Sequence, residues 1–410
     1  MINMFELVSL KPIIILIAIS AFIPVILSLL KLKFIPVFVV EIVAGMIIGQ
    51  FFNKNGYFSN ELTDGFYTIG MAFLLFLSGL DTDFDVIKKS RKGDGVNINP
   101  FKVSLILLIA VILISCLMSF AFYSFIKDGH KVEGILLLTI CLSSTFASIV
   151  IPIVHEKGSA KTSIGQIIGT YSTMSELLSI VSLSGFMIMN EVNEQNPWLL
   201  LILLGILIAT YLIKKFIPTK RFENAMGGVV HLGTRLILLV FLILIVISEE
   251  AGAEFILGSF LAGMVIRASN PSHETIEKVE VIGYGIFIPM FYVLVGVRIP
   301  FFELFTTPKY ILLILALTAA LIVVKIPFLL LYRWYHTGTV IPTMFLVTCT
   351  IIVSIALEHF HVFDSTFVAC LIVASSLTCL IPPIIFEANP KFDIAKEKYK
   401  DIILETHEVE

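Results

Sequence analysis

The sequence predicts an all-α polytopic membrane protein with about 13 transmembrane helices. Of its 410 residues, 58% are hydrophobic and only 14% are charged, and the mean hydropathy is +0.99. Soluble domains are nearer half apolar and a quarter charged. A membrane-spanning helix needs about 20 mostly apolar residues. Thirteen such stretches can be placed, with approximate edges 12–30, 34–52, 64–80, 101–126, 133–155, 163–190, 198–217, 229–248, 251–268, 281–299, 309–332, 341–358 and 363–386.

Lysine and arginine gather in every second connection between these stretches, around residues 31–33, 88–102, 157–161, 214–221, 267–278 and 333. Such connections are preferentially cytoplasmic. With an odd number of spans, we expect the N-terminus outside and the C-terminus in the cytoplasm. Residues 1–10 (MINMFELVSL) carry no Lys or Arg, so no secretory signal peptide is expected.

Composition also limits which partners and cofactors are expected. The net charge of −3 gives no indication of a nucleic-acid partner. The cysteines all fall inside apolar stretches, where they are expected to be small apolar fillers. Their spacing is not that of a metal site, so no cofactor is expected. They are Cys116, Cys141, Cys349, Cys370 and Cys379.

Three short motifs recur in the same order, which predicts an internal repeat. The pairs are Glu41–Ile48 with Ser259–Ile266 (EIVAGMII, SFLAGMVI), Phe76–Asp81 with Val293–Arg298 (FLSGLD, VLVGVR), and Cys141–Thr145 with Leu346–Thr350 (CLSST, LVTCT). The partners lie seven stretches apart, an odd number, so the two copies must face opposite ways. Inverted repeats are typical of secondary transporters. The alternative is convergent small-residue packing.

The repeat defines an expected domain organisation. Residues 1–410 form a single transmembrane transporter domain, with a first repeat at 12–190 and an inverted second repeat at 229–386. Residues 387–410 form a short cytoplasmic tail. No Gly-rich phosphate loop follows a strand pattern, so no nucleotide-binding regulatory domain is expected.

Two of the stretches are expected to contain broken helices. Hydroxyl side chains next to a proline can satisfy the backbone groups that are freed when a helix unwinds. Two such stretches in matching repeat positions predict a binding site between them. The alternative is ordinary packing by Ser and Thr. The polar residues are Ser143, Ser144 and Thr145 in stretch five, and Thr348 and Thr350 in stretch twelve.

Glu176 is the leading candidate for an ion-binding residue. It lies in the apolar stretch 163–190, where a carboxylate costs several kcal/mol unless it is paired, hydrated or protonated. Ser172 and Ser179 fall on its helical face, and Ser175 precedes it. These hydroxyls could offer oxygen ligands to an alkali cation, which Glu176 would exchange for a proton. The alternative is a Glu locked in a salt bridge.

A second intramembrane charge, Lys325, is the expected counter-charge. It lies in stretch eleven and could pair with Glu176 when no cation is bound; the alternative is that it snorkels to the cytoplasmic surface. Glu41, near the start of stretch two, is expected to have a structural or gating role at a helix interface.

Other charges are expected near the membrane surfaces. His231 and Arg235 are expected at the membrane interface. The cluster Glu249, Glu250 and Glu254 either draws cations toward the protein or is a solvated loop.

Five segments resemble the cation:proton antiporter-2 family of Kef-type and NapA-type transporters. They are Pro36–Gly49, Phe73–Phe84, Cys141–Val150, Phe255–Ile266 and Phe287–Ile299. The resemblance implies thirteen spans, a homodimer, and a core domain that moves against a dimerisation domain. It also implies two crossed broken helices, here stretches five and twelve.

The family's ion site is an Asp-Asp or Gln-Asp pair on stretch six, where this chain has Ser175-Glu176. Lys325 looks like the basic residue that pairs with this site. A single acid implies electroneutral exchange of one cation for one proton.

These observations favour a secondary active antiporter for Na⁺ or K⁺ in the bacterial plasma membrane, surrounded by lipid and serving pH homeostasis by alternating access. The alternative is a transport-inactive sensor or regulatory subunit of the same fold, which the missing Asp permits. The sequence lacks HExxH and GxGD motifs, so an enzyme is not expected. A channel is less favoured, because broken inverted repeats are typical of alternating access. Nothing in the sequence separates Na⁺ from K⁺.

Overall fold

A computed structural model of the chain describes residues 11–32, 35–52, 57–58, 61–81, 99–126, 129–156, 162–190, 232–250, 254–269, 271–333, 337–348, 351–357 and 362–388. Every regular element in these ranges is helical, and one isolated β-bridge joins Ile126 to Phe363. The all-α prediction is therefore confirmed for the described ranges. The predicted stretch 198–217 lies outside them.

Six of the described helices are long and apolar enough to cross a membrane. These are α1 (Lys11–Leu29), α3 (Glu61–Asp81), α5 (Pro100–Ala121), the segment His273–Arg298, the segment Pro308–Tyr332, and Ser365–Pro382 within α19 (Ser365–Ala388). Two shorter apolar helices are α2 (Val37–Phe52) and most of α12 (Glu254–Ser269). The chain is thus a multi-pass membrane protein, and the full count of thirteen spans stays a prediction.

One predicted boundary differs clearly from the structure. Stretch ten was expected to start at residue 281, but its helix starts at His273 with α13 (His273–Ile282). It then runs through a π-helical turn, η3 (Gly283–Phe287), into α14 (Ile288–Arg298). The first turns of α13 are rich in charged residues, so they form a helix that hydropathy alone does not detect.

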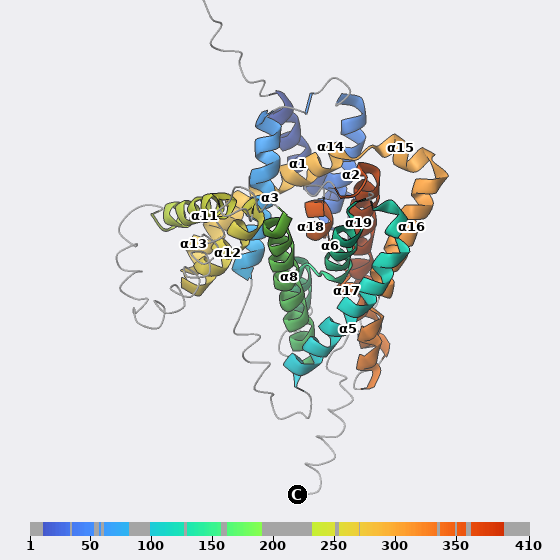
Figure 1. Cartoon of the computed structure of the whole chain (residues 1–410). Helices are drawn as coiled ribbons and strands as arrows, with labels where there is room; N and C mark the ends of the chain where they lie inside the picture. The colour runs from blue at the N-terminus through green and yellow to red at the C-terminus, as the bar shows by residue number, and fades with distance from the viewer. Residues whose placement is uncertain are drawn as a thin grey trace, which may run out of the picture. The chain divides into compact units, whose positions relative to one another are not determined.

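The chain divides into two compact units, and each combines segments from both predicted repeats. Unit 1 consists of Met1–Lys31, Val40–Asp83 and Ile180–Phe301; unit 2 consists of Leu32–Val39, Phe84–Ser179 and Phe302–Glu410. Figure 1 labels their helices.

Unit 1 is built around two glycine crossings, at which helix backbones touch. A Cβ on Gly45 of α2 would overlap the carbonyl oxygen of Val293 on α14, and a Cβ on Gly296 would overlap that of Ile42. Gly79 of α3 and Gly263 of α12 form the same kind of contact. All four glycines belong to the repeated motifs, so each crossing joins a motif of one repeat to a motif of the other. Small residues let helices approach closely, so this arrangement fits both the predicted repeat and the alternative of convergent small-residue packing, and the repeat stays a prediction.

Unit 2 holds α5, α6 (Lys131–Ser143), α7 (Ala147–Glu156), most of α8 (Ser163–Asn190), α16 (Pro308–Val323) and the helices that follow it. Figure 1 shows α5 beside α6 and α16 beside α19. One hydrophobic cluster joins α5, α7, α8 and α17 (Thr337–Leu346), with Leu107, Val150, Ile167 and Val347 among its buried members.

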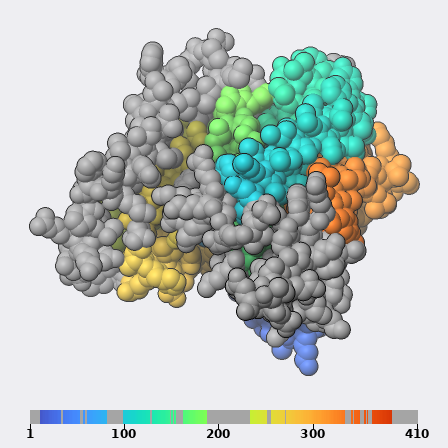
Figure 2. All heavy atoms as spheres, turned by 90° about the horizontal axis from the view of Figure 1, so that it is seen from below, coloured from blue at the N-terminus to red at the C-terminus, as the bar shows by residue number. Residues whose placement is uncertain are grey.

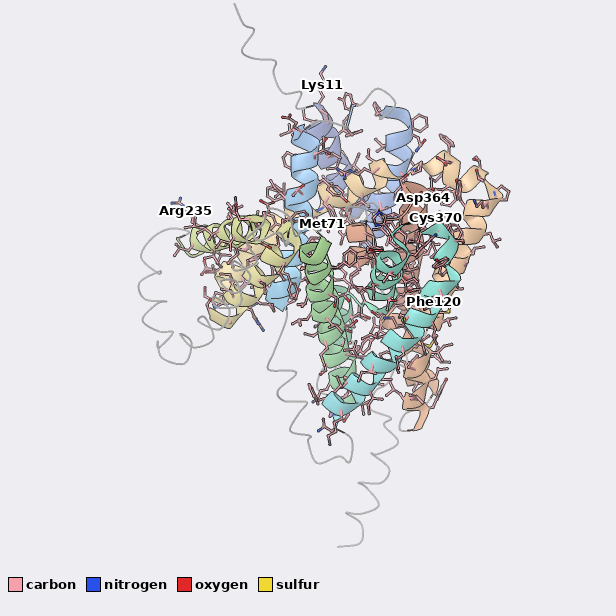
Figure 3. The ribbon with its side chains drawn as sticks, viewed as in Figure 1. Lys11, Met71, Phe120, Arg235, Asp364 and Cys370 are labelled. Atoms are coloured by element: carbon pink, nitrogen blue, oxygen red, sulfur yellow. The ribbon has the colours of Figure 1, made fainter. Side chains whose placement is uncertain are left out.

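The outward side of α5 is apolar. Ile106 is 59% exposed and Leu117 is 70% exposed. Atoms of α5, in cyan, lie uncovered on the face seen in Figure 2, and Figure 3 marks Phe120 on the same helix. In a multi-pass membrane protein, such a surface is suited to contact with lipid.

Candidate ion-binding site

The site begins where stretch five loses its helical conformation. Helix α6 ends at Ser143, Ser144 is extended (φ −61°, ψ 159°), and α7 starts at Ala147. The Ser143 hydroxyl donates to the Ile140 carbonyl at 3.1 Å, and the Ser144 hydroxyl donates to the Cys141 carbonyl at 2.8 Å. Short hydroxyl side chains thus offer the last turn of α6 partners that compete with helical hydrogen bonding.

A second interruption occurs in stretch twelve, where α17 ends at Leu346 and α18 (Ile351–Ala356) follows. The Thr348 hydroxyl donates to the Phe345 carbonyl at 2.6 Å, while Thr378 of α19 donates to the Thr348 carbonyl at 3.1 Å. The hydroxyl of Thr145 donates to the Val347 carbonyl at 2.8 Å, so the two interruptions touch. The structure therefore contains both predicted helix breaks, whereas Thr350 lies outside its described residues.

Lys325 is completely buried, at the turn that leads from α16 into the 3₁₀ segment η4 (Ile326–Arg333). Its ammonium donates to the carbonyl oxygens of Ser143 and Ser144, both at 2.9 Å. It also donates to the Thr145 hydroxyl at 3.1 Å and to the Tyr171 hydroxyl at 3.2 Å. The snorkelling alternative is therefore wrong, because the side chain points into the protein.

These contacts have a clear electrostatic basis. The last carbonyl groups of a helix lack intrahelical donors and carry a partial negative charge. The Lys325 ammonium supplies both hydrogen bonds and a compensating charge to the end of α6. A buried ammonium would be very costly without such partners.

Glu176 occupies the opposite end of the same interruption. Its side chain is 6% exposed, and Oε2 accepts a hydrogen bond at 3.1 Å from the backbone N–H of Ala147, the first residue of α7. The N-terminal end of a helix carries a partial positive charge, which stabilises a carboxylate there. Two buried side chains of opposite charge, Lys325 and Glu176, thus stabilise the two helix ends at this interruption. Direct pairing of Glu176 with Lys325 stays a prediction.

The three serines near Glu176 are all buried but play different parts. The Ser175 hydroxyl donates to the Ser143 carbonyl at 3.0 Å, which fastens α8 to the end of α6. The Ser179 hydroxyl donates to the Ser175 carbonyl at 2.8 Å, within its own helix. The Ser172 hydroxyl has no hydrogen-bond partner among the described residues. Because a hydroxyl that donates its hydrogen keeps lone pairs on its oxygen, the oxygens of all three serines can accept a bound ion.

Sequence reasoning missed Tyr171 and the Ala147 N–H as parts of the site. Tyr171 is fully buried, accepts from Lys325, and packs edge-on against Phe328 with ring centroids 4.7 Å apart. A signal for Tyr171 was available, because it is the only ionisable residue besides Glu176 between Ile164 and Met189. The Ala147 N–H could not have been found from side-chain types.

The remaining candidates lie elsewhere. Glu41 belongs to unit 1 and is 3% exposed. Glu249, Glu250 and Arg235 are exposed on α11 (Leu232–Glu250), whereas His231 and the Glu254 side chain lie outside the described residues. Within the described ranges, no group of three or more His, Cys, Asp or Glu could hold a metal ion.

Residues 15–388 match the family model described as "Sodium/hydrogen exchanger, transmembrane". The chain belongs to this family. Its members are exchangers, so the expectation that the chain is not an enzyme is confirmed at the level of the family. The finer assignment to the cation:proton antiporter-2 group is not decided by this match.

Named relatives agree with the family. "Putative Na(+)/H(+) antiporter YjbQ" of Bacillus subtilis (strain 168) is 31% identical over 396 residues, covering 92% of this chain. The chain spans only 63% of that relative's length. An Enterococcus hirae protein named "Na(+)/H(+) antiporter" is 26% identical over 301 residues, covering 71% of this chain and 73% of the relative.

The fold resembles that of the sodium proton antiporter MjNhaP1 from Methanocaldococcus jannaschii, with a TM-score of 0.57 and 15% identity. The match covers 93% of this chain and 97% of the other. At this level of identity, the likeness shows the fold.

Proposed function

We propose that this chain is a secondary active antiporter that exchanges a monovalent cation, Na⁺ or K⁺, for a proton, with Glu176 binding either ion. One observation carries the proposal: a buried carboxylate lies at the interruption of a membrane helix, against the first N–H of α7. Interrupted helices of this kind form the ion sites of secondary transporters. The names of the Bacillus and Enterococcus relatives support the same activity.

The chemistry of the site suits an alkali cation. Such a cation needs oxygen ligands to replace its water shell, and a carboxylate with nearby hydroxyls supplies them. Glu176 Oε1 and Oε2 and the Ser172 hydroxyl oxygen are the proposed ligands, and the oxygens of Ser175 and Ser179, whose hydrogens are donated to backbone carbonyls, are proposed as further ligands. A proton on Glu176 would remove the negative charge that attracts the cation, so the two ions compete for one group.

The proposed stoichiometry is one cation for one proton, because the Ser175-Glu176 pair holds one carboxylate. Lys325 remains positively charged and compensates the end of α6. In the proposed cycle, it also acts as the counter-charge to Glu176 when the cation has left. Exchange of one positive charge for another is electroneutral.

The subfamily, transport mechanism, oligomeric state, location, physiological role and membrane orientation of the chain are proposed as well. The chain belongs to the cation:proton antiporter-2 group, works by alternating access as a homodimer in the bacterial plasma membrane, and serves pH homeostasis. Its N-terminus lies outside and its C-terminus in the cytoplasm, as the distribution of Lys and Arg favours. The resemblance of the five motif segments supports these points.

The test is dissipation of a preset pH gradient in proteoliposomes, with Na⁺ and K⁺ added separately. We expect at least one cation to dissipate the gradient. Glu176→Gln, which keeps the shape but cannot bind a cation by charge, should reduce the signal to that of protein-free liposomes. Glu303→Gln, an exposed acid on α15 (Phe301–Thr306), is the matched control and should stay active.

Two outcomes would contradict the proposal. A fully active Glu176→Gln variant would remove Glu176 from the mechanism. Silence with both cations, in protein shown to be folded, would favour a sensor or regulatory subunit of the same fold. The replacement of the family's first acid by Ser175 is the observation behind that second candidate.

A further inference from the structure

Unit 1 contains a buried acid that the proposed exchange site does not use. Glu41 of α2 is only 3% exposed, and its carboxyl group makes no hydrogen bond or ion pair with the described part of the chain. It lies one helical turn before Gly45, on the face that contacts α14. A carboxylate in such a place is strongly destabilising, whereas the neutral acid costs far less.

The glycine crossing leaves little space for ions or water beside this face. The backbones of α2 and α14 touch at Gly45 with Val293 and at Gly49 with Val297, so the two helices run in the same direction. One helical turn before the pair Gly45 and Val293, the same alignment of α2 with α14 brings Glu41 to the level of Pro289. The nitrogen of Pro289 carries no hydrogen to donate. Helix α14 therefore offers no backbone donor at that residue to stabilise a negative charge.

The charged groups on the neighbouring helices do not supply a counter-charge to Glu41 either. Arg298 of α14 is paired with Asp64 at 2.9 Å and lies over the Tyr67 ring, 3.6 Å from its centroid. Lys11 is exposed at the first residue of α1, as Figure 3 shows. The other ionisable groups on α14 and on the helical segments that pack against it are acids or phenols, which cannot neutralise a carboxylate: Glu61, Asp81, Tyr284 of η3 and, on α14 itself, Tyr292.

The repeat gives a second, independent observation. The aligned motifs EIVAGMII and SFLAGMVI put Ser259 of α12 in the position that matches Glu41. Ser259 is fully buried, and its hydroxyl has no hydrogen-bond partner among the described residues. At both glycine crossings, this position therefore holds a polar group without a hydrogen-bond partner among the described residues. Of the two, only the Glu41 carboxyl group can bind and release a proton.

From these observations, we propose that Glu41 is a second proton-binding site, separate from Glu176, whose proton must be present for the α2–α14 crossing to close. Ionisation of Glu41 places an unpaired charge on the contact face and weakens the crossing. The folded chain then holds a proton that the unfolded chain releases, so stability falls as the pH rises. The proposal does not depend on the exchange activity.

The first test is infrared difference spectroscopy of the purified protein between acidic and alkaline buffers. We expect a signal from a protonated carboxyl group that is lost in Glu41→Gln and retained in Glu176→Gln. Glu61→Gln, an exposed acid on α3, is the matched control and should leave this signal unchanged. A signal that persists in Glu41→Gln, or that is absent from the unchanged protein, overturns the proposal.

The second test is thermal unfolding in detergent across the same pH range. The unchanged protein should lose stability in the alkaline range, and Glu41→Gln and Glu41→Met should both lack this loss. If stability depended instead on a hydrogen bond from Glu41, Met would be unstable at every pH, which would overturn the proposal. An alkaline loss that is the same in all three proteins would overturn it too. Both readouts are independent of transport, so a failure of the exchange hypothesis would be recognised separately.

Discussion

The helix interruption of unit 2 and the glycine crossings of unit 1 differ in what the helix backbone requires. The interruption requires new hydrogen-bond partners, whereas the crossings require close contact between intact helices. At the interruption, backbone groups lose their helical partners, and Lys325, Glu176 and hydroxyl side chains replace them. At the crossings, the helices stay intact and glycines let their backbones touch. The interruption presents polar groups that can bind a small ion, whereas the crossings leave little space for an ion. Ion chemistry is therefore expected at the interruption, and close mechanical coupling of helices at the crossings.

The largest expected effect tests whether the interruption depends on its buried charge. Lys325→Met leaves the Ser143 and Ser144 carbonyls without the ammonium, and should lower the free energy of unfolding by about 3 kcal/mol. Thermal unfolding in detergent measures this loss. In proteoliposomes, the pH profile or the apparent cation affinity of exchange should change as well. Lys309→Met, at the exposed start of α16, is the control and should have little effect on either. An unchanged stability would mean that the interruption does not need the charge.

The next prediction tests the crossings. A Cβ on Gly45 would overlap backbone atoms of α14, whereas a Cβ on Gly65 of α3 would meet nothing within 4 Å. Gly45→Ala should therefore destabilise the protein by about 1–3 kcal/mol, because the helices must separate. Gly263→Ala should have a similar effect, since it belongs to the matching crossing. Thermal unfolding is the measurement, and Gly65→Ala is the control. A Gly45→Ala variant as stable as Gly65→Ala would show that backbone contact is not required.

The smallest expected effect separates a serine of the proposed site from a buried serine of the same helix that lies outside the site. Ser172→Ala removes a hydroxyl without a described partner, so stability should be unchanged while the apparent KM for the cation rises severalfold, on the order of 1 kcal/mol. Ser184→Ala, on the same helix but outside the proposed site, removes a buried hydroxyl that donates to the Ile180 carbonyl at 2.9 Å, so the KM should be unchanged. Exchange rates at several cation concentrations measure both. Equal KM values would exclude Ser172 as a ligand.

Several features of the site could be predicted from the sequence because they follow from the cost of polarity in a membrane. Glu176 and Lys325 are conspicuous in apolar stretches, and hydroxyl clusters beside prolines indicated both helix interruptions. The five motif segments indicated a cation:proton antiporter, and the match to the sodium/hydrogen exchanger family over residues 15–388, which span all five, confirms this at the level of that family; the cation:proton antiporter-2 group stays a prediction. The starting residue of α13 was missed because a charged helical turn has no hydropathy signal.

What the sequence determined by itself is the chemistry available: a polytopic α-helical chain with an acid, Glu176, and a base, Lys325, deep in separate apolar spans. Tertiary structure decided which atoms those charges meet. Lys325 reaches the carbonyl end of α6 across 182 residues of chain, and Glu176 reaches the first N–H of α7. The hydrogen-bond partners of Ser175 and Tyr171 were decided in the same way. Local sequence fixes where a helix breaks, but only the packing of distant helices determines which side chains stabilise its two free ends, since those partners are brought together by the fold.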